Sequence, residues 1–343
     1  KGRTASGNKE RDQKAFLELL ASCRDEAKLL PPDPNQVPLL NNGNSTEKFQ
    51  GRIPALEEIL DSVEQSTAGQ DLAGLFASGP VIRANRNSKG QSHWFSNETF
   101  FFDYSLYNGP KAAKGVYAGA DWSEETWRKN IDRTKTQLDL LSKKAVKVNP
   151  GKYRTYFAPA AFGDLASMMN WKALSAAAWK QGQSPFKKLA DGELKLSPLL
   201  NVKENFSLGL SPRFNELGEM APAALPLIEK GELKELLVSS RTAKEFGLKS
   251  NSANSYESPR ALDISWGSLS EQNALKELGT GLYLSNLHYL NWSDPLSARV
   301  TGMTRYACFW VEKGEIAGPI QDLRWDESLY RSEEHTSELQ SRG

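Results

Sequence analysis

Apolar residues recur at three- and four-residue intervals in three stretches of the first 149 residues, a spacing typical of amphipathic helices. The predicted helices are residues 9–30, residues 53–63 and a segment that begins after Asp121 or Ser123 and reaches Leu141. Between the second and third helices lie four runs with strand character, at residues 72–77, 81–86, 91–96 and 100–106. They predict an antiparallel meander with a tight turn at residues 87–90.

The second half of the chain opens with a predicted strand and a predicted long helix. Residues 152–157 alternate between two sets of side chains, and Pro159 ends the strand because proline cannot donate to a ladder. Apolar residues from Phe162 to Ala173 then repeat at helical spacing. This pattern predicts one helix that continues through Lys180.

The later segments are mainly strand-like. Residues 281–292 alternate as a strand, and residues 306–320 predict a hairpin that turns at Lys313 and Gly314, while residues 240–246 predict a short helix. We therefore expect an α+β chain of two domains: residues 1–149, an antiparallel sheet with helices, and residues 150–330, a β-rich domain. Residues 331–343 resemble the translation of a sequencing adapter, and we interpret them as a gene-assembly artefact.

The charge balance and the number of cysteines narrow the possible binding partners and cellular compartments. The chain carries 43 Lys and Arg against 42 Asp and Glu, which argues against binding to nucleic acid or a membrane surface through net charge. No apolar run approaches the length of about 20 residues that spans a bilayer. The two cysteines, Cys23 and Cys308, lie far apart and suggest a reducing compartment. We expect a cytoplasmic protein.

Histidine is scarce, which limits the metal sites that the chain could build. There are three, His93, His288 and His335, and the last lies in the segment interpreted as an artefact. A catalytic zinc ion usually takes about three protein ligands from histidine, cysteine and carboxylates. His288 and Cys308 form the only candidate pair of soft ligands.

Each candidate for chemistry has a plainer alternative. Cys308 could be a nucleophile with His288 as its base, but a packed histidine and a buried thiol are the favoured interpretation. Glu216, like Glu219 and Asp263, could be a general acid or base. Without a partner motif, a surface or loop carboxylate is the favoured interpretation of each.

Four segments resemble the TldD/PmbA family. One is the strand PGKYRTYFAP before the small-residue helix, and another is ELLVSSRTAKEFGLKSN at residues 235–251. The third is TGMTRYACFWVEKGEIAGPIQDLRW at residues 301–325, which is similar to the family's C-terminal signature. The fourth combines an Asp-Leu-x-Gly strand at residues 71–74 with the turn at residues 87–90. The resemblance extends roughly from Asp71 to Trp325.

The resemblance also implies where a metal would bind. In the TldD branch, the helix that follows the equivalent of the PGKYRTYFAP strand carries two zinc-binding histidines and a glutamate. Their pattern is His-Glu-x-x-x-His. Setting residues 184–186 against the turn that follows that helix places Ser175 and Ala176 at the His-Glu pair and Lys180 at the second histidine. None of the three binds zinc, and the ammonium of Lys180 repels a cation.

The resemblance therefore implies a TldE/PmbA-like protein without a metal, and no cofactor is expected. Its partner would be a TldD-type metallopeptidase subunit, or a second copy in a homodimer, and its substrate an extended peptide held by main-chain pairing. Two alternatives stay open. One is an active zinc metallopeptidase that uses unrecognised ligands. The other is a stand-alone module that binds peptides or sugars through aromatic residues.

Overall fold

The computed structural model describes residues 6–265 and 267–331, in two compact units, Lys1–Pro38 and Leu39–Gly343. The first unit contains α1 (Lys9–Ala27), in which the side chain of Asn8 accepts a hydrogen bond from the amide of Arg11. This helix confirms the prediction at residues 9–30, although it ends three residues early. Among the described residues, no helix is both long and apolar enough to cross a bilayer.

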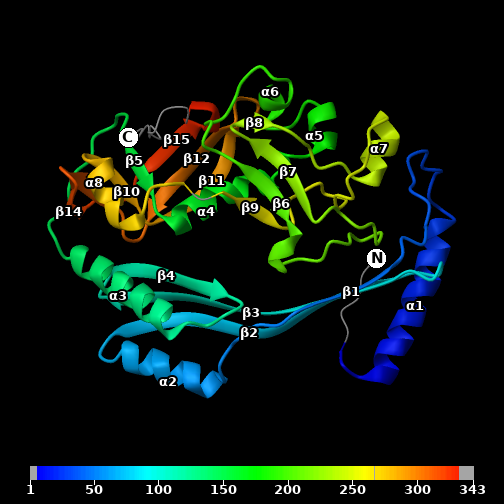
Figure 1. The fold of residues 1–343 in the computed structure, drawn as a ribbon, viewed down its shortest axis with the longest axis horizontal. Coiled ribbons are helices and arrows are strands. Elements are labelled where there is room, and N and C mark those ends of the chain that lie inside the picture. The colour runs from blue at the N-terminus through cyan, green and yellow to red at the C-terminus, as the bar shows by residue number, and fades with distance from the viewer. Residues whose placement is uncertain (1–5, 266, 332–343) are drawn as a thin grey trace. The chain divides into compact units, whose positions relative to one another are not determined.

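The second unit opens with a sheet built around two unusually long strands (Figure 1). Its members are β1 (Asn44–Phe49), β2 (Asp71–Arg86), β3 (Ser92–Asn108) and β4 (Lys111–Gly119). β2 pairs with β3 from Asp71 opposite Tyr107 to Arg86 opposite Ser92. The ladder is continuous, so the prediction of four short strands is wrong, although the turn at residues 87–90 is confirmed.

The break that suggested separate strands comes from Gly79 and Pro80, which interrupt the alternation of side chains. Proline is tolerated here because β2 is an edge strand and one side of its backbone needs no partner. The pattern missed β4 entirely. It also missed β1, which pairs parallel to β3, so the sheet is not wholly antiparallel.

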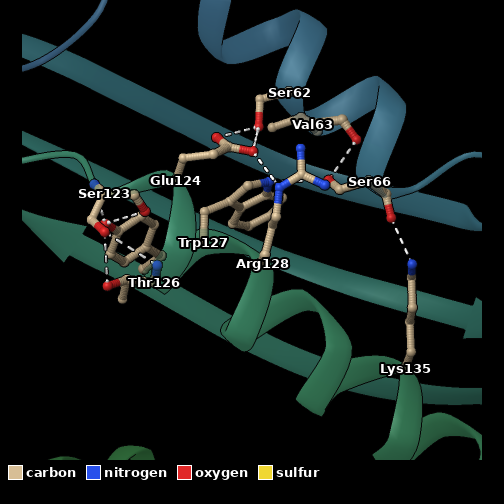
Figure 2. A network of polar contacts seen from close by, with 10 residues as sticks. Ser62, Val63, Ser66, Ser123, Glu124, Thr126, Trp127, Arg128 and Lys135 are labelled. Atoms are coloured by element: carbon tan, nitrogen blue, oxygen red, sulfur yellow. Dashed lines mark hydrogen bonds and ion pairs between the residues drawn. The ribbon is translucent and has the colours of Figure 1, made fainter.

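Two helices, α2 (Leu56–Ser66) and α3 (Glu124–Leu140), pack against the core formed by one face of this sheet. Ser123 caps α3 by accepting a hydrogen bond from the amide of Thr126. Figure 2 shows how polar contacts join the two helices at Ser66. The indole N–H of Trp127 donates to Oγ of Ser66 over 3.0 Å, and the ammonium of Lys135 donates to its carbonyl. Trp127 can therefore be fully buried with its polar atom satisfied.

Among the residues that the structure describes, the part of the chain after residue 150 forms three smaller sheets. Their strand orders are β14-β13-β10-β5, β11-β12-β15 and β8-β7-β6-β9. The strands are β5 (Thr155–Phe157), β6 (Val202–Asn205), β7 (Ala224–Glu229), β8 (Glu232–Leu233), β9 (Leu262–Ile264), β10 (Gly281–Leu284), β11 (Asn286–Asp294), β12 (Arg299–Arg305), β13 (Phe309–Glu312), β14 (Glu315–Pro319) and β15 (Arg324–Ser328). The predicted hairpin is confirmed as β13 and β14, and the predicted strand at residues 281–292 divides into β10 and β11. The α+β class is confirmed.

In the described part of the chain, five short α-helices lie between these strands. They are α4 (Pro159–Ser167), α5 (Ala176–Lys180), α6 (Lys187–Ala190), α7 (Ser240–Phe246) and α8 (Ala274–Leu278). One hydrophobic cluster joins side chains on both sides of residue 150, since Trp127 and Leu138 of α3 share it with Tyr283 and Phe309. The division into domains at residues 149 and 150 stays a prediction.

The predicted long helix after Pro159 is wrong, because the chain leaves the helical path halfway. α4 ends in a short 3-10 turn at Met168–Asn170, and Lys172 then adopts a positive φ of 65°. Leu174 and Ala176 pair with the backbone of Leu237 instead of forming helical bonds, over 2.8 and 3.0 Å. The small side chains of Ser175 and Ala176 allow this close approach, and α5 begins at Ala176.

Candidate functional site

The position that the resemblance assigns to a metal is occupied by a buried network around Glu257. Ser175 caps α5 by accepting from the amide of Ala178 over 3.0 Å, and its hydroxyl donates to Oε2 of Glu257 over 2.7 Å. The same oxygen accepts from the amide of Ala177, and Oε1 accepts from the amide of Ser239, both over 2.8 Å. Glu257 is 2 % exposed, so these bonds replace the water that the carboxylate loses.

The three aligned positions do not face one point. Ser175 and Ala176 are buried at the start of α5, where the amide of Ala176 pairs with Leu237. Lys180 is exposed at the other end of the helix, and its ammonium lies 4.3 Å from the ring centroid of Trp179. A hydroxyl already bonded twice, a methyl group and an exposed cation do not fit a zinc ion.

Cys308 lies in a closed environment. It is 3 % exposed, and its thiol lies 3.3 Å from the carbonyl oxygen of Arg305 and 3.9 Å from that of Asn286. Burial raises the pKa of the Cys308 thiol, although hydrogen bonds partly oppose the shift. A thiol kept protonated in this way is a poor nucleophile and a poor metal ligand.

His288 lies on β11 with an exposed side chain, and its ring centroid is 3.9 Å from that of Tyr289. Within residues 6–265 and 267–331, no group of three histidine, cysteine or carboxylate side chains is arranged to hold a metal ion. His335 lies outside these residues. The structure thus gives His288 and Cys308 separate surroundings, the first open and the second closed.

His288 does line a cavity of about 440 Å³. The cavity is bounded by β4, α4, β11 and the end of β12. Asp164 of α4 reaches the edge of β11, where Oδ2 accepts from the amide of Leu287 over 3.2 Å. Burial raises the pKa of Asp164, and this hydrogen bond and the charges of Lys114 and His288 lower it in part.

The cavity also holds polar groups that sequence reasoning missed. Asn286 is 7 % exposed, and its Oδ1 is buried without a hydrogen-bond partner among the described residues. Arg305 approaches Asp322 only to 3.8 Å, which is an ion pair beyond hydrogen-bond length. One feature of the sequence could have identified Asp164 as a candidate. It is the only charged residue in α4, whose other residues are mostly small or apolar. Asn286 and Arg305 had none, because only the pairing of β11 with β12 brings them together.

The carboxylates considered as acid or base candidates lie elsewhere. Glu216 is exposed on a loop, where its side chain accepts from the amide of Ser255. Glu219 accepts from Asn215 and Ser240. Asp263 on β9 accepts from Asn205 over 2.9 Å and pairs with Lys203. Each of these carboxylates therefore has a structural partner.

Comparison with known proteins identifies the relatives of this fold. TldE from Thermococcus kodakarensis superposes with a TM-score of 0.72 at 16% identity, covering 96% of this chain and 78% of that chain. A putative modulator of DNA gyrase from Bacteroides thetaiotaomicron gives a TM-score of 0.72 at 15% identity, covering 99% and 83%. A putative modulator of a DNA gyrase from Thermotoga maritima gives 0.68 at 17%, covering 86% and 73%. At these identities the likeness shows the fold alone.

Sequence comparison is more specific. No curated protein matches the chain significantly. The model of the PmbA/TldA metallopeptidase C-terminal domain matches residues 150–342, which is more than half of the chain. The chain therefore belongs to the TldD/PmbA family of peptidase-related proteins.

Proposed function

We propose that this protein is a metal-free subunit of a peptide-processing metalloprotease, similar in role to TldE or PmbA. The single observation that carries the proposal is the Glu257 network, which fills the aligned metal position with hydrogen bonds between protein groups. Catalysis then depends on a TldD-type subunit that carries the His-Glu-x-x-x-His helix. The present chain completes the binding surface in the cytoplasm and is not catalytic alone.

An edge strand supports the proposed binding of extended peptides. β2 is 16 residues long and, among the strands described, pairs only with β3. Its outer edge carries main-chain donors and acceptors, and an extended peptide can add to such an edge without needing particular side chains. This mode of binding suits unfolded substrates of varied sequence.

The test compares the chain alone with the chain mixed with the TldD-type subunit of the same organism. We expect the two to co-elute in size-exclusion chromatography, and an unstructured fluorogenic peptide to be cleaved by the mixture. Metal analysis should find zinc in the partner and none in stoichiometric amount in this chain. The partner alone and a TldD-type variant without its first histidine are the controls.

Two results would contradict the proposal. One is stoichiometric zinc together with peptide hydrolysis by the purified chain alone, which would support an active metallopeptidase. The other is a chain that neither binds the TldD-type subunit nor changes its rate of cleavage. That result would support a stand-alone binding module.

A further inference from the structure

The outer edge of β2 carries little of the charge that usually keeps an exposed strand from pairing with another chain. β2 borders its sheet (Figure 1) and, among the described strands, pairs only with β3. From Leu72 to Ile82 it has no charged residue, and the side chains of Leu75 and Ile82 are 66 % and 48 % exposed. Proteins usually shorten, charge or cover such an edge, because unpaired main-chain groups invite association. The edge of β2 is therefore suited to binding a second strand.

Other edge strands in the described part of the chain are less suitable. β4 has nine residues and carries Lys111 and Lys114. β11 also has nine residues, but its ladder is irregular between His288 and Asn291 and again after Trp292. β2, with 16 residues and an unbroken ladder to β3, offers the longest regular edge.

The proline in β2 indicates which residues present their main chain to the open side. Pro80 has no N–H, so it fits an edge strand with its nitrogen turned away from β3. Successive residues alternate in the direction of their main-chain groups, so the even-numbered residues from Leu72 to Ile82 face outward. The carbonyl of Ile82 agrees with this direction, because it accepts a hydrogen bond from the guanidinium of Arg83 over 3.2 Å. Two copies of β2 that pair antiparallel must therefore match even-numbered residues with even-numbered residues.

The charges near the ends of β2 select one register for such a pair. Asp71 begins the strand, Arg83 lies near its other end, and both side chains are exposed. When Ala77 lies opposite Ala77 of a second copy, across a two-fold axis, Asp71 of each copy lies opposite Arg83 of the other. A shift to the next allowed two-fold register places Asp71 opposite Val81 or Asn85. The strand is therefore complementary to itself in charge at one register.

Large side chains lie opposite small ones in this register. Leu75 lies opposite Gly79 of the second copy, and Val81 lies opposite Ala73. A Cβ built on Gly79 would meet no atom within 4 Å, so the space for the leucine is open. Cross-strand pairs of this kind stabilise a sheet through the contacts between opposite side chains.

We propose that two copies of this chain associate through the outer edges of β2, antiparallel and centred on Ala77. Their sheets then form one continuous sheet across the two-fold axis. A contact between two strands is smaller than a standard interface, so we expect a reversible dimer with a Kd of about 1–100 µM. The dimer hides the edge that is proposed to bind extended peptides, and only this consequence rests on the proposed function.

Sedimentation velocity of the purified chain alone tests the association. We expect a shift from monomer to dimer as the concentration rises from about 1 to 200 µM, a range that brackets the expected Kd. A chain that stays monomeric throughout this range would overturn the proposal.

A charge placed on the two-fold axis should weaken the dimer. Ala77→Glu sets two carboxylates directly opposite each other, and we expect association to weaken at least about tenfold, because opposed like charges destabilise a sheet. The matched control is Ala118→Glu on β4, an exposed alanine in the same row across Phe101. It should associate as the unchanged chain does. Equal association of the two variants would show that the dimer forms elsewhere.

Reversing the charges tests the register. Asp71→Arg and Arg83→Asp should each weaken association about three- to tenfold, and the double variant should restore it, since exposed ion pairs contribute little individually but occur twice here. A double variant as weak as the single ones would contradict the pairing of these two positions.

An engineered disulfide gives a test that does not depend on affinity. Opposite residues of a non-hydrogen-bonded pair have Cα atoms about 4.5 Å apart, within the range of a disulfide. Ala77→Cys should therefore form a covalent dimer under mild oxidation, and Ala118→Cys should not. Both are made with Cys23→Ser, because Cys23 is only half-buried. Absence of the Ala77→Cys crosslink would overturn the proposal.

These measurements need neither a TldD-type subunit nor peptide cleavage. If the chain dimerises through β2 but fails to join a TldD-type subunit, the proposed function fails and the self-association stands. If the chain joins the subunit and supports cleavage but is monomeric alone, the self-association fails by itself.

Discussion

Two polar clusters in the second unit use similar residue types and reach opposite states. In the Glu257 network, both carboxylate oxygens accept hydrogen bonds, and the carboxylate is 2 % exposed. In the cavity beside α4, Asp164 accepts one hydrogen bond from Leu287, and Asn286 accepts none at its side chain. The first cluster satisfies its carboxylate with protein groups, whereas the second leaves one buried amide oxygen, Oδ1 of Asn286, without a partner among the described residues.

The comparison teaches that the residues aligned with the family's metal site and the residues with unpaired polar atoms belong to different parts of the fold. The resemblance to the family points to Ser175, Ala176 and Lys180, but the first two are buried in internal contacts. Polar side chains with fewer protein partners, Asp164 and Arg305, line the cavity beside α4. Residues at the aligned positions contribute to internal hydrogen bonding, and mutation can test this contrast with the cavity.

The largest expected effect comes from removing the carboxylate of the closed cluster. Glu257→Ala leaves the amides of Ala177 and Ser239 and the hydroxyl of Ser175 without an acceptor. We expect the free energy of unfolding to fall by about 3 kcal/mol or more, measured by urea denaturation, because each buried unsatisfied donor costs about 1–3 kcal/mol. The control is Glu216→Ala, which removes an exposed carboxylate. Equal stability of the two variants would mean that the network is not closed in solution.

A smaller effect is expected from restoring the metal-binding residue types. The triple variant Ser175→His, Ala176→Glu, Lys180→His should not bind stoichiometric zinc after incubation and desalting, because residue 175 is a buried N-cap outside the helix whereas residue 180 is exposed. It should lose roughly 2 kcal/mol of stability, from the missing cap and from crowding at buried Ala176. The single variant Lys180→His, at the exposed position, is the control for stability. Tight zinc binding by the triple variant would remove the distinction between the two clusters.

Much of the fold could be predicted from hydrophobic periodicity. The helices α1, α3 and α7 and the hairpin of β13 and β14 were predicted because each has a regular pattern and its own turn or cap. The continuous strand β2 could not be predicted, because Gly79 and Pro80 resemble a turn. A strand can contain them only because β2 lies at the edge of its sheet. The break between α4 and α5 also escaped prediction, because it depends on pairing with Leu237, more than 60 residues away in sequence.

The candidate site was predicted less well than the fold. His288 was identified as a candidate, but with Cys308 as its partner, whereas the structure places it on a cavity with Asp164 and Arg305. Spacing along the chain cannot reveal that set, since its members come from α4, β11 and β12. Burial of the Cys308 thiol agrees with the interpretation favoured from the sequence, whereas the expected packed histidine is wrong because His288 is exposed.

The smallest predicted effect concerns the pH dependence of the open cluster. Burial raises the pKa of Asp164, so the folded chain holds this proton more tightly than the unfolded chain. The free energy of unfolding should therefore fall as the pH rises from the unfolded pKa, about 4, through the raised folded pKa. Asp164→Asn should remove this part of the slope, and the exposed Asp132→Asn should not.

The size of that change follows from the openness of the cavity. Because Asp164 is half-buried and faces Lys114 and His288, we expect less than about 1 kcal/mol, measured as the difference between urea-denaturation profiles at several pH values. The hydrogen bond from the amide of Leu287 lowers the pKa and can still be accepted by the oxygen of asparagine, so the variant tests the charge alone. Unchanged slopes in Asp164→Asn would mean that water reaches this carboxyl as freely as in the unfolded chain. The cavity would then be part of the solvated surface, and its contrast with the Glu257 network would disappear.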